Sequence, residues 1–467
     1  MKCWFWMAIL VSPGLFAQND LQANVNLQFR FTNPGARAQA MGGAFIGLAD
    51  DTTAMFANPA GLAQLTSSTF ILEANRAEDD HNIPFYGGRI QQTGLQDFSF
   101  DLEERDFPDD SVGLPFMGYV NAKSRIKWGF FYAELARMNR KFNTVGVGVP
   151  SFPAGRDVVD NTIEIFLPSQ NSLELDLRSL GFSFGTRLTE QWWVGATLVY
   201  YDFQYKANST LSFPDLGALF PDENFPPGQL EAIEPLIGET LIVVDTDGDD
   251  QQVGFFGGVM YAPNDRFSVG FAYKQQPKFD YDHASQSRDA AFELVPFESG
   301  SSQFNVPDSY GMGLAFRPTD FFLLSLDVNR MVYSELADDY KAFFANSNDT
   351  TGGGQTIRDA TEYRVGAEYF ITSFKYPLAL RAGYWFDPYH ALTNVTSDTQ
   401  LLFRYSDNAG DNVQDVRTTA FLQRFEEDQN HITAGFGLSL GQHFVLDLSG
   451  DFAANTSNIS ISGIYRF

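Results

Sequence analysis

The chain has very little cysteine: Cys3 is the only one among 467 residues. Cys3 lies in an N-terminal segment that we expect to be removed on export, so the mature protein would have no thiol. Disulfide bonds, thiolate metal sites and cysteine nucleophiles are therefore not expected. A lipoprotein anchor is not expected either, because Cys3 precedes the apolar part of this segment.

Positive charge and long apolar runs are also scarce. The 31 Lys and Arg residues stand against 58 Asp and Glu, a formal net charge of −27. Nucleic acid is not an expected partner, because phosphate binding needs a basic face. No segment after the N-terminal one has the roughly 18 apolar residues that a helical span requires. Aromatic residues, by contrast, make up 15% of the chain.

Residues 1–17 have the pattern of a secretory signal peptide. Lys2 supplies the positive charge, residues 4–11 are apolar, and a cleavage site is predicted near Ala17. The apolar run is too short to serve as a membrane anchor. We therefore predict an exported protein.

Apolar and polar residues alternate with a period of two over many long segments. Near the C-terminus, for example, Leu446 and Leu448 alternate with Asp447 and Ser449. Many of these segments reach ten residues, which is close to the 9–11 or so that cross a membrane as a tilted strand. Strands of a soluble β-sandwich, the alternative fold, are usually about 5–6 residues long. The pattern favours strands with an apolar face toward lipid and a polar face toward a lumen.

Fourteen such strands are predicted. They lie near residues 67–77, 112–122, 126–139, 174–187, 191–206, 251–262, 266–282, 304–317, 321–333, 361–372, 376–387, 430–440, 443–453 and 457–467. Tight turns near 122–125, 189–190, 263–265, 318–320, 372–375 and 441–442 take turns with long loops near 78–111, 140–173, 207–250, 283–303, 334–360 and 388–429. Short periplasmic turns and long external loops are the plan of outer-membrane proteins. We therefore predict an all-β fold, a 14-stranded antiparallel transmembrane β-barrel over residues 67–467.

Aromatic residues gather at the predicted strand ends, as the girdles at two membrane interfaces require. Beside the tight turns these are Trp128, Trp192, Trp193, Phe267, Phe321, Phe322, Tyr376 and Phe444; at the far ends they are Tyr200, Tyr201, Phe203, Tyr333, Trp385, Phe386 and Phe452. The last strand ends on Phe467, and an aromatic C-terminal residue matches the signature of outer-membrane barrels.

The segment between the signal and the first strand carries a specific motif. From Asn33 it reads NPGARAQAMGGAFIGLADD, and NPAGL follows at residues 58–62. This pattern resembles the FadL/TodX (OMPP1) family of outer-membrane transporters for long-chain fatty acids and aromatic hydrocarbons. The resemblance implies a location in the bacterial outer membrane and a luminal hatch, with Gly42, Gly43, Asn58, Pro59, Ala60 and Gly61 as hatch-motif residues. It also implies diffusive uptake of hydrophobic ligands and their release sideways into the bilayer.

Residues 18–66 suit a luminal hatch, or plug, on physical grounds too. Gly and Ala dominate, so the backbone can pack closely, while Met41, Phe45 and Phe56 need burial. Asp50 or Asp51 can cap a short helix that ends before a proline. A 14-stranded barrel is too wide for its own side chains to fill. The alternative is a tail that hangs free in the periplasm.

Five residues are candidates for ligand binding. Phe213, Leu216, Phe220 and Leu236 belong to an apolar group in the 207–250 loop, which either collects ligand or folds onto a small core of its own. Arg381 is predicted at mid-height in the lumen with Asp327 and Glu368. It could bind a ligand carboxylate, or it could neutralise one of these two acids.

The sequence gives no enzyme or metal site. Residues 181–185 and 437–441 both read G-x-S-x-G, but they fall within predicted strands, and a hydrolase needs this motif at a strand-to-helix turn. The five histidines, His81, His283, His390, His431 and His443, have no ligand spacing, and the acidic run 245–250 lacks the closing Glu of a calcium loop. We expect no catalytic residue, metal or cofactor.

The leading hypothesis is a channel for hydrophobic small molecules. We expect a monomer in contact with outer-membrane lipid and lipopolysaccharide, inserted by the barrel-assembly machinery. The alternative is a non-transporting barrel of the same superfamily that acts as a secretion accessory, like PorV, which this N-terminal segment also resembles. An outer-membrane lipase is a third class, but no Ser–His pair can be placed.

Overall fold

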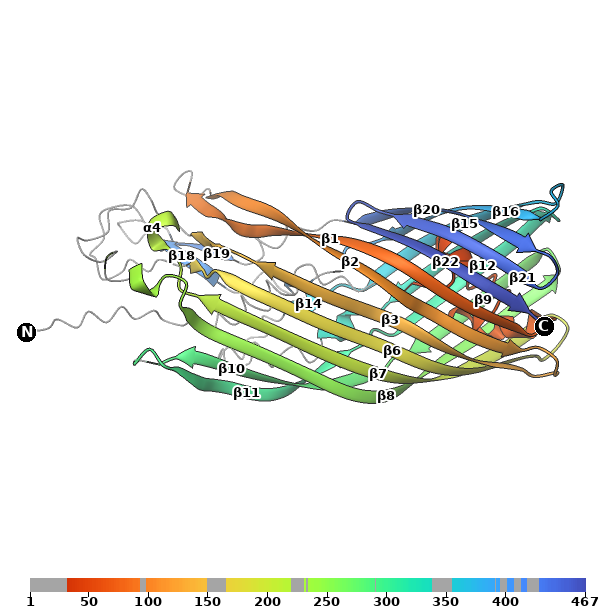
Figure 1. Cartoon of the computed structure of the whole chain (residues 1–467), viewed down its shortest axis with the longest axis horizontal. Coiled ribbons are helices and arrows are strands. Elements are labelled where there is room, and N and C mark those ends of the chain that lie inside the picture. Colours follow the sequence, from red (N-terminus) through yellow and green to blue (C-terminus); the bar gives the residue numbers. More distant parts are fainter. Residues whose placement is uncertain are drawn as a thin grey trace, which may run out of the picture.

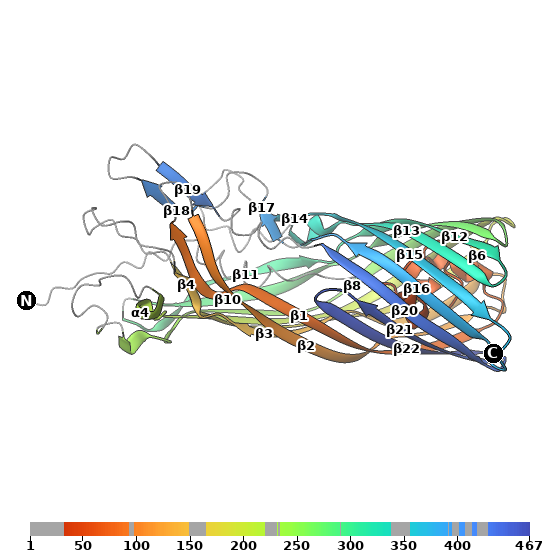
Figure 2. The same ribbon diagram turned by 90° about the horizontal axis from the view of Figure 1, so that it is seen from above.

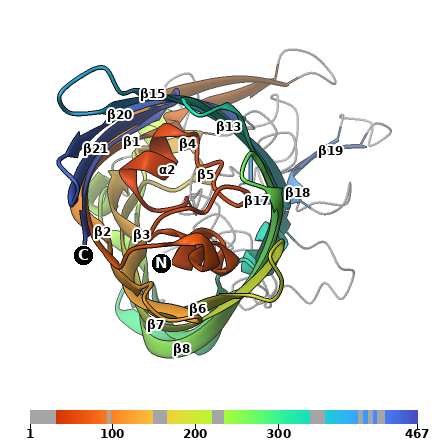
Figure 3. The ribbon, with the colours of Figure 1, turned by 90° about the vertical axis from the view of Figure 1, so that its right-hand side faces the viewer.

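The computed structural model describes residues 32–92, 98–148, 165–219, 231, 234–289, 291–337, 355–390, 392–394, 401–406, 413–417 and 428–467. The predicted signal peptide, residues 1–17, lies outside these ranges. Within them, no helix is long and apolar enough to cross a membrane. The chain forms a closed antiparallel β-barrel around a small helical segment (Figures 1 and 3). Its wall has fourteen strands, and we call each of them a stave, whether it is continuous or broken into two shorter strands.

Twelve staves are single strands and two are each split into two strands. The single ones are β1 (Thr69–Gln92), β2 (Phe98–Asn121), β3 (Lys127–Asn143), β6 (Ser169–Arg187), β7 (Trp192–Ser212), β8 (Thr240–Asn264), β13 (Phe322–Met331), β15 (Ala360–Ile371), β16 (Leu378–Asp387), β20 (Gln429–Leu440), β21 (Phe444–Phe452) and β22 (Thr456–Arg466). The split ones are β9 (Phe267–Gln275) with β10 (Lys278–Arg288), and β11 (Leu294–Asn305) with β12 (Ser309–Thr319). The predicted strand count is thus confirmed.

The barrel closes between its first and last staves. β22 pairs with β1 from Thr69↔Arg466 to Asp79↔Thr456. All six predicted tight turns join neighbouring staves, and they lie together at the end where the C-terminus is found (Figure 1). By the plan of outer-membrane barrels, this end is the periplasmic one.

Small strands lie toward the opposite end of the molecule. β4 (Gly146–Gly148) pairs in parallel with β1 and antiparallel with β5 (Ile165–Phe166). Two separate two-stranded sheets join β14 (Gln355–Ile357) to β17 (Leu392–Asn394) and β18 (Leu401–Ser406) to β19 (Val413–Arg417). Figure 2 shows this end extending far past the compact half of the barrel.

The two split staves break at adjacent prolines. Pro277 separates β9 from β10 and Pro307 separates β11 from β12, because proline has no N–H to donate to a ladder. The two breaks are tied together by Val306 N, which donates to the carbonyl of Pro277 over 3.1 Å. The predicted strand 266–282 therefore spans a bend, and the predicted loop 283–303 is largely a continuation of the β10–β11 hairpin.

The outer face of the barrel is apolar near the periplasmic end. Phe182, Leu198 and Phe255 are 51%, 59% and 44% exposed on three successive staves, and similar side chains continue around the wall. We call this band the apolar belt. On the inner face of the same staves lie small or polar residues such as Ser183 and Thr197, which are fully buried. A soluble sandwich would show the reverse, with its apolar side chains inside.

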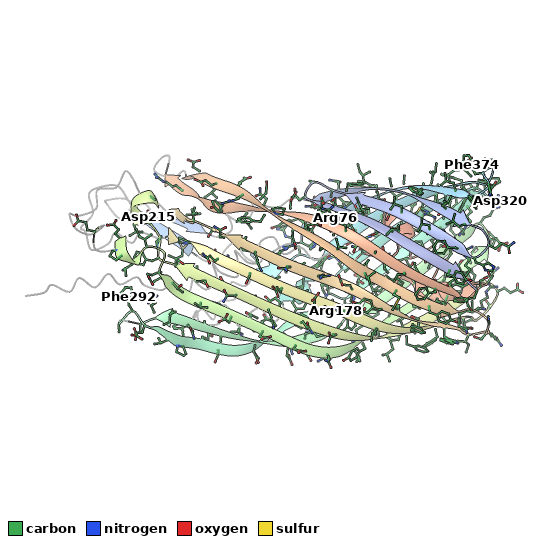
Figure 4. The ribbon with its side chains drawn as sticks, viewed as in Figure 1. Arg76, Arg178, Asp215, Phe292, Asp320 and Phe374 are labelled. Carbon is green, nitrogen blue, oxygen red and sulfur yellow. The ribbon has the colours of Figure 1, made fainter. Side chains whose placement is uncertain are left out.

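Above a row of polar residues, the outer face of the wall becomes polar and the inner face becomes apolar. Glu134, Arg178, Asp202 and Gln251 lie side by side in register on β3, β6, β7 and β8, and we call them the boundary row. Arg178 lies midway along the barrel in Figure 4, far from both the Phe374 turn and the Phe292 tip. Beyond the row, outward side chains are polar and inward ones are apolar and buried, as in Leu173, Leu175 and Leu177 of β6.

The inner wall therefore differs from the uniformly polar lumen that alternation predicts. β3, β6, β7, β8, β10 and β11 present Phe and Leu to the interior, whereas β13, β15, β16, β20 and β21 present Asp, Glu, Arg and His. The girdle prediction is also partly wrong. Trp192, Tyr200, Phe321, Tyr376 and Phe452 face outward as expected, but Trp193, Tyr201, Phe203, Tyr333 and Trp385 are buried inside.

Candidate functional site: the hatch and the cavity above it

The hatch consists of three short helical segments inside the barrel (Figure 3). They are α2 (Ala36–Ala40), α3 (Ala54–Ala57) and the 3-10 helix η1 (Pro59–Gln64). Proline starts η1 because its fixed φ and missing N–H suit a first helical position. Asn58 caps the same turn, and its side chain accepts a hydrogen bond from Ala60 N over 3.2 Å. Almost every residue from 36 to 63 is buried.

Two hatch-motif glycines occupy backbone conformations that other residues rarely adopt. Gly42 has φ 65° and Gly43 has φ 72°. A Cβ on Gly42 would lie 2.8 Å from the carbonyl oxygens of Val365 and Tyr384. Glycine is therefore needed here both for the positive φ and for the close approach of the hatch backbone to the barrel wall.

The remaining motif residues bring η1 against the opposite wall. The Asn58 amide donates to Ile46 O over 3.0 Å within the hatch and to Val259 O of β8 over 3.4 Å. A Cβ added to Gly195 of β7 would meet the carbonyl carbon of Pro59 at 2.2 Å. The hatch thus touches the wall on both sides.

Wall side chains on the polar half bind the hatch backbone directly. Asp327 of β13 accepts from the N–H groups of Phe45 over 2.6 Å and Ile46 over 2.8 Å. Thr433 of β20 accepts from Gly42 N over 3.0 Å. Buried carboxylates that receive several backbone hydrogen bonds are strongly bound, so these contacts hold the loop after α2 in one position.

An ion-pair network anchors α2. Arg37 of α2 lies 2.8 Å from Glu368 of β15 and also bonds Asp50 within the hatch. Arg381 of β16 lies 2.6 Å from Glu368 and 2.6 Å from Asp447 of β21. Of the two readings of Arg381, the structure therefore shows charge neutralisation, with Glu368 and Asp447 as partners and not Asp327. Its role in ligand binding stays a prediction without a contact to support it.

A cavity opens between the hatch and the wall. The cavity is small and is partly open to solvent. Hatch residues form one side, and β9, β12, β13 and β15 form the others. The lining residues are Asn33, Ile46, Phe56, Ala57, Ala272, Lys274, Gln276, Ser309, Tyr310, Gly311, Asn329, Met331, Glu362 and Arg364. The lining is mixed: polar and charged side chains such as Lys274 and Glu362 lie beside apolar ones such as Phe56 and Met331.

An aromatic column leads from this cavity toward the extracellular end. Phe203 stacks on Phe279 with ring centroids 4.6 Å apart and on Phe304 at 5.2 Å. Below them, Phe56 of the hatch meets Phe131 at 6.0 Å. These rings belong to one continuous buried apolar cluster on the inner wall. The sequence analysis did not predict this column, although the alternate residues Tyr201, Phe203 and Tyr205 of β7 indicate an aromatic inner face.

The candidate loop residues lie apart from the cavity. Phe213 and Leu216 are 4% and 5% exposed, and Leu236 is partly buried. Phe213 N donates to Glu239 O, which folds the loop back on itself beside the buried group Leu167, Leu211 and Ile242. Phe220 lies outside the described residues. The geometry agrees with a loop that packs on its own core, and ligand binding by this loop stays a prediction.

The barrel wall has a seam between β2 and β3. Their ladder runs only from Phe116↔Ala133 to Asn121↔Trp128, although both strands continue much farther. Above it, side chains bridge the strands: Arg137 donates to Val112 O and Asp109 accepts from Asn139 N, both over 3.4 Å. The ladder ends at Ala133, one residue below Glu134 of the boundary row, so the seam begins at the boundary row, at the upper edge of the apolar belt.

The residues that resemble a serine-hydrolase motif or a metal site lie in the barrel wall, where they make structural contacts. Ser183 of the first G-x-S-x-G motif lies within β6 and shares a 2.8 Å hydrogen bond with Thr197 of β7. The second motif occupies β20 and the turn after it. His431 pairs with Asp451 over 2.8 Å in the polar wall. In the described part of the chain, no group of three or more His, Cys, Asp or Glu residues could hold a metal ion.

A closed barrel with an apolar outer belt, an internal hatch and an apolar column above it defines a transmembrane transport barrel. Residues 22–398 match the family model described as outer membrane protein transport protein (OMPP1/FadL/TodX). The chain therefore belongs to this family, and its place is the bacterial outer membrane. No curated protein sequence matches the chain significantly.

Solved structures agree on the fold. A FadL homologue from Pseudomonas aeruginosa matches with 15% identity and a TM-score of 0.57, covering 94% of this chain and 99% of that one. The CymD monoaromatic hydrocarbon channel matches with 15% identity and a TM-score of 0.56 at the same coverage. The Pseudomonas putida toluene transporter TodX matches with 16% identity and a TM-score of 0.52, covering 94% and 99%.

Proposed function

We propose that this protein is a channel through which hydrophobic small molecules, such as long-chain fatty acids or aromatic hydrocarbons, diffuse across the outer membrane. The observation that carries the proposal is the buried aromatic column that ends at the hatch cavity. Phe203, Phe279 and Phe304 have no reason to face a water-filled lumen, because apolar surface is stabilised away from water. Two of the structural neighbours are described as channels or transporters for aromatic hydrocarbons.

The route we propose starts at the extracellular wall. The inward side chains above the boundary row are apolar, so a hydrophobic solute entering there stays out of water down to the cavity. The hatch closes the direct path below the cavity, since its backbone is bonded to β13, β20 and β8. No nucleotide site is required, because movement down a concentration gradient supplies the driving force.

We propose that the ligand leaves sideways at the lower end of the β2–β3 seam, beside the boundary row. At the seam the backbone ladder is absent, so opening it breaks side-chain bridges instead of a row of backbone hydrogen bonds. Met55 of α3 packs against Gly118 of β2 and Gly129 of β3, just below the end of the ladder. A shift of α3 would therefore uncover, from the inside, the short β2–β3 ladder that lies directly below the seam.

Uptake measurements test this function. Cells that carry the protein are expected to accumulate labelled fatty acid or toluene faster than cells that lack it. Deletion of residues 18–60 should change the rate and admit hydrophilic solutes as well, because the lumen would stand open. Equal uptake by cells with and without the protein would remove the proposal.

The second candidate function is a secretion accessory of the PorV type. It predicts a stable protein partner on the extracellular loops and no dependence of uptake on the aromatic column. Purification of the protein from its native membrane, followed by identification of bound proteins, separates the two. A stoichiometric secreted partner together with unchanged uptake in a Phe279→Asp variant would favour the accessory.

A further inference from the structure

The barrel wall has a second interruption, between β8 and the broken stave of β9 and β10. The β8–β9 ladder ends at Phe255↔Gln275, and β8 pairs with β10 only from Asp247↔Asp282 upward. Between these two pairs, no strand pairing joins β8 to the broken stave in the part of the chain that the structure describes. We call this stretch of wall the β8 gap. It is separated from the β2–β3 seam by β3, β6 and β7.

The β8 gap crosses the upper edge of the apolar belt. Gln251 of the boundary row lies within the gap on β8. Below Gln251 the next outward side chain is Val253, which is 65% exposed, and above it is Asp249. Lys278 and Asp280 are exposed on the β10 side. The lower part of the gap therefore faces lipid acyl chains, and its upper part faces the head groups.

Aromatic rings of the column cover the β8 gap from the inside. A Cβ on Gly254 of β8 would lie 2.8 Å from the Tyr201 ring. Likewise, a Cβ on Gly248 would lie 3.1 Å from the Phe203 ring. Both rings are fully buried, and Phe203 stacks on Phe279. A molecule that passes between β8 and the broken stave therefore reaches the aromatic column directly, without meeting the hatch.

Side chains hold the β8 gap closed. Asp250 of β8 accepts a hydrogen bond from Asp280 N over 3.0 Å. The Tyr201 hydroxyl donates to the side chain of Gln276, which precedes Pro277 at the break in the stave. Opening the wall here breaks side-chain contacts and no backbone ladder. It is therefore easier than opening the wall where neighbouring staves are paired.

We propose that the β8 gap is a second entrance to the channel, for hydrophobic molecules that are already dissolved in the outer leaflet. The proposal rests on the proposed function and adds a source of ligand to it, because hydrophobic solutes partition from water into lipid. The ladders above and below limit the opening, so a slim molecule with one alkyl chain fits it best. Its chain enters beside Val253 as the Tyr201 ring moves off Gly254. The hydrogen bond to Gln276 returns the ring when the molecule has passed.

Photolabelling from the membrane tests this entrance. The full-length protein is reconstituted in phosphatidylcholine vesicles that contain a hexadecanol analogue with a terminal diazirine, a probe of very low solubility in water. After illumination, mass spectrometry locates the label. We expect label on Phe203 and Phe279 of the column as well as on Leu198, which faces the lipid on β7 and measures exposure to the same pool.

Closing the β8 gap should remove the label from the column. Asp249→Cys with Asp280→Cys places two thiols on outward positions across the gap, where dibromobimane can bridge them. Asp247→Cys with Asp282→Cys is the matched control, because the ladder already joins these two residues. We expect the bridge across the gap to lower column labelling about tenfold relative to Leu198. The bridge across the ladder should leave it unchanged.

Tyr201→Phe tests the closing contact by itself. This variant keeps the ring and loses the hydrogen bond to Gln276, so column labelling should rise. Tyr205→Phe is its control, because Tyr205 lies higher on β7 and packs on Tyr281. Heat-dependent gel mobility reports whether each barrel is folded. Column labelling that persists in a folded, bridged protein would overturn the entrance, as would a column without label in the unaltered protein. Equal labelling of Tyr201→Phe and the unaltered protein would overturn the closing role of Tyr201.

Uptake by cells separates this proposal from the function beneath it. If bridging the gap leaves column labelling unchanged while cells with the protein still take up toluene faster than cells without it, the entrance fails and the channel function remains. If cells with the unaltered protein take up toluene no faster than cells without it, the channel function itself fails.

Discussion

Arg381 is the residue on which the polar half of the lumen most depends, since two buried carboxylates share it. Glu368 keeps Arg37 as a second partner, but no other cation pairs with Asp447 among the described residues. A carboxylate that is buried without a partner is strongly destabilising, whereas a paired one is roughly neutral. The contact therefore matters for the integrity of the wall and the hatch more than for ligand binding.

We predict that Arg381→Met lowers the free energy of unfolding by about 3–5 kcal/mol, because Asp447 is left without a counter-ion. Urea unfolding in detergent micelles measures this change. Arg178→Met is the control, because Arg178 is 40% exposed and its ion pair with Asp176 lies on the outer face. An exposed pair contributes about 0–1 kcal/mol. Equal losses in the two variants would contradict the assigned role of Arg381.

Gly42 offers a second test at this scale. Gly42→Ala combines an unfavourable positive φ with a clash against two wall carbonyls, and we expect a loss of about 2–4 kcal/mol from strain and overpacking together. Gly238→Ala has a positive φ of 81° but nothing within 4 Å, so it isolates the backbone strain. Protection of the hatch from added protease provides the measurement. If the Gly238 variant is the more affected protein, the close approach is not what selects glycine at position 42.

At the scale of elements, the alternation of apolar residues predicted that all fourteen staves exist, together with the six tight turns at the periplasmic end. It did not predict their full lengths: residues 78–92 and 98–111, expected to be loop, belong to β1 and β2. The prediction failed above the boundary row, because there the apolar side chains face the interior of the barrel and the polar ones face outward. In β8, the outward residues Asp245, Asp247 and Asp249 belong to a paired strand, yet a run of aspartates reads as a loop. The cavity could not be predicted from the sequence either. Lys274 and Glu362 lie 88 positions apart in the sequence, and only the register of β9, β12, β13 and β15 brings them to one place.

The β2–β3 seam gives a prediction for these elements. Residues 128–133 of β3 have ladders on both sides, whereas residues 136–143 pair only with β6. Amides without a ladder partner open more easily. In the upper segment we therefore expect every second amide to exchange at least tenfold faster than the amides of residues 128–133. Uniform slow exchange along all of β3 would show that the wall is closed there.

For the whole molecule, the apolar belt sets the position in the membrane. From Trp192 to Tyr200 on β7 the belt is roughly 20 Å tall, given about 3.4 Å per residue and a tilt near 40°. The boundary row then lies at the upper interface. Everything beyond it projects outside the bilayer, which is consistent with the polar outer face there.

A pair of charge substitutions tests this placement. Leu198→Arg lies within the belt and should cost about 2–4 kcal/mol of folding free energy in lipid vesicles, while Gln204→Arg, above the boundary row, should cost about 0–1 kcal/mol. Both side chains face outward on β7. Denaturant titration of the vesicle-inserted protein gives the two values. A cost at position 204 as large as that at position 198 would place the membrane higher than the boundary row.

Above the boundary row the barrel wall is polar on its outer face and apolar on its inner face, and this arrangement has one more consequence. On β6 it continues from Arg178 to Ser169, which is roughly 20–25 Å of height at the usual rise and tilt. That height overlaps the layer of hydrated sugars that covers the outer leaflet and repels oily solutes. Because the wall is charged on its outer face and apolar on its inner face, a hydrophobic solute inside it would cross the sugar layer without contact with the hydrated sugars.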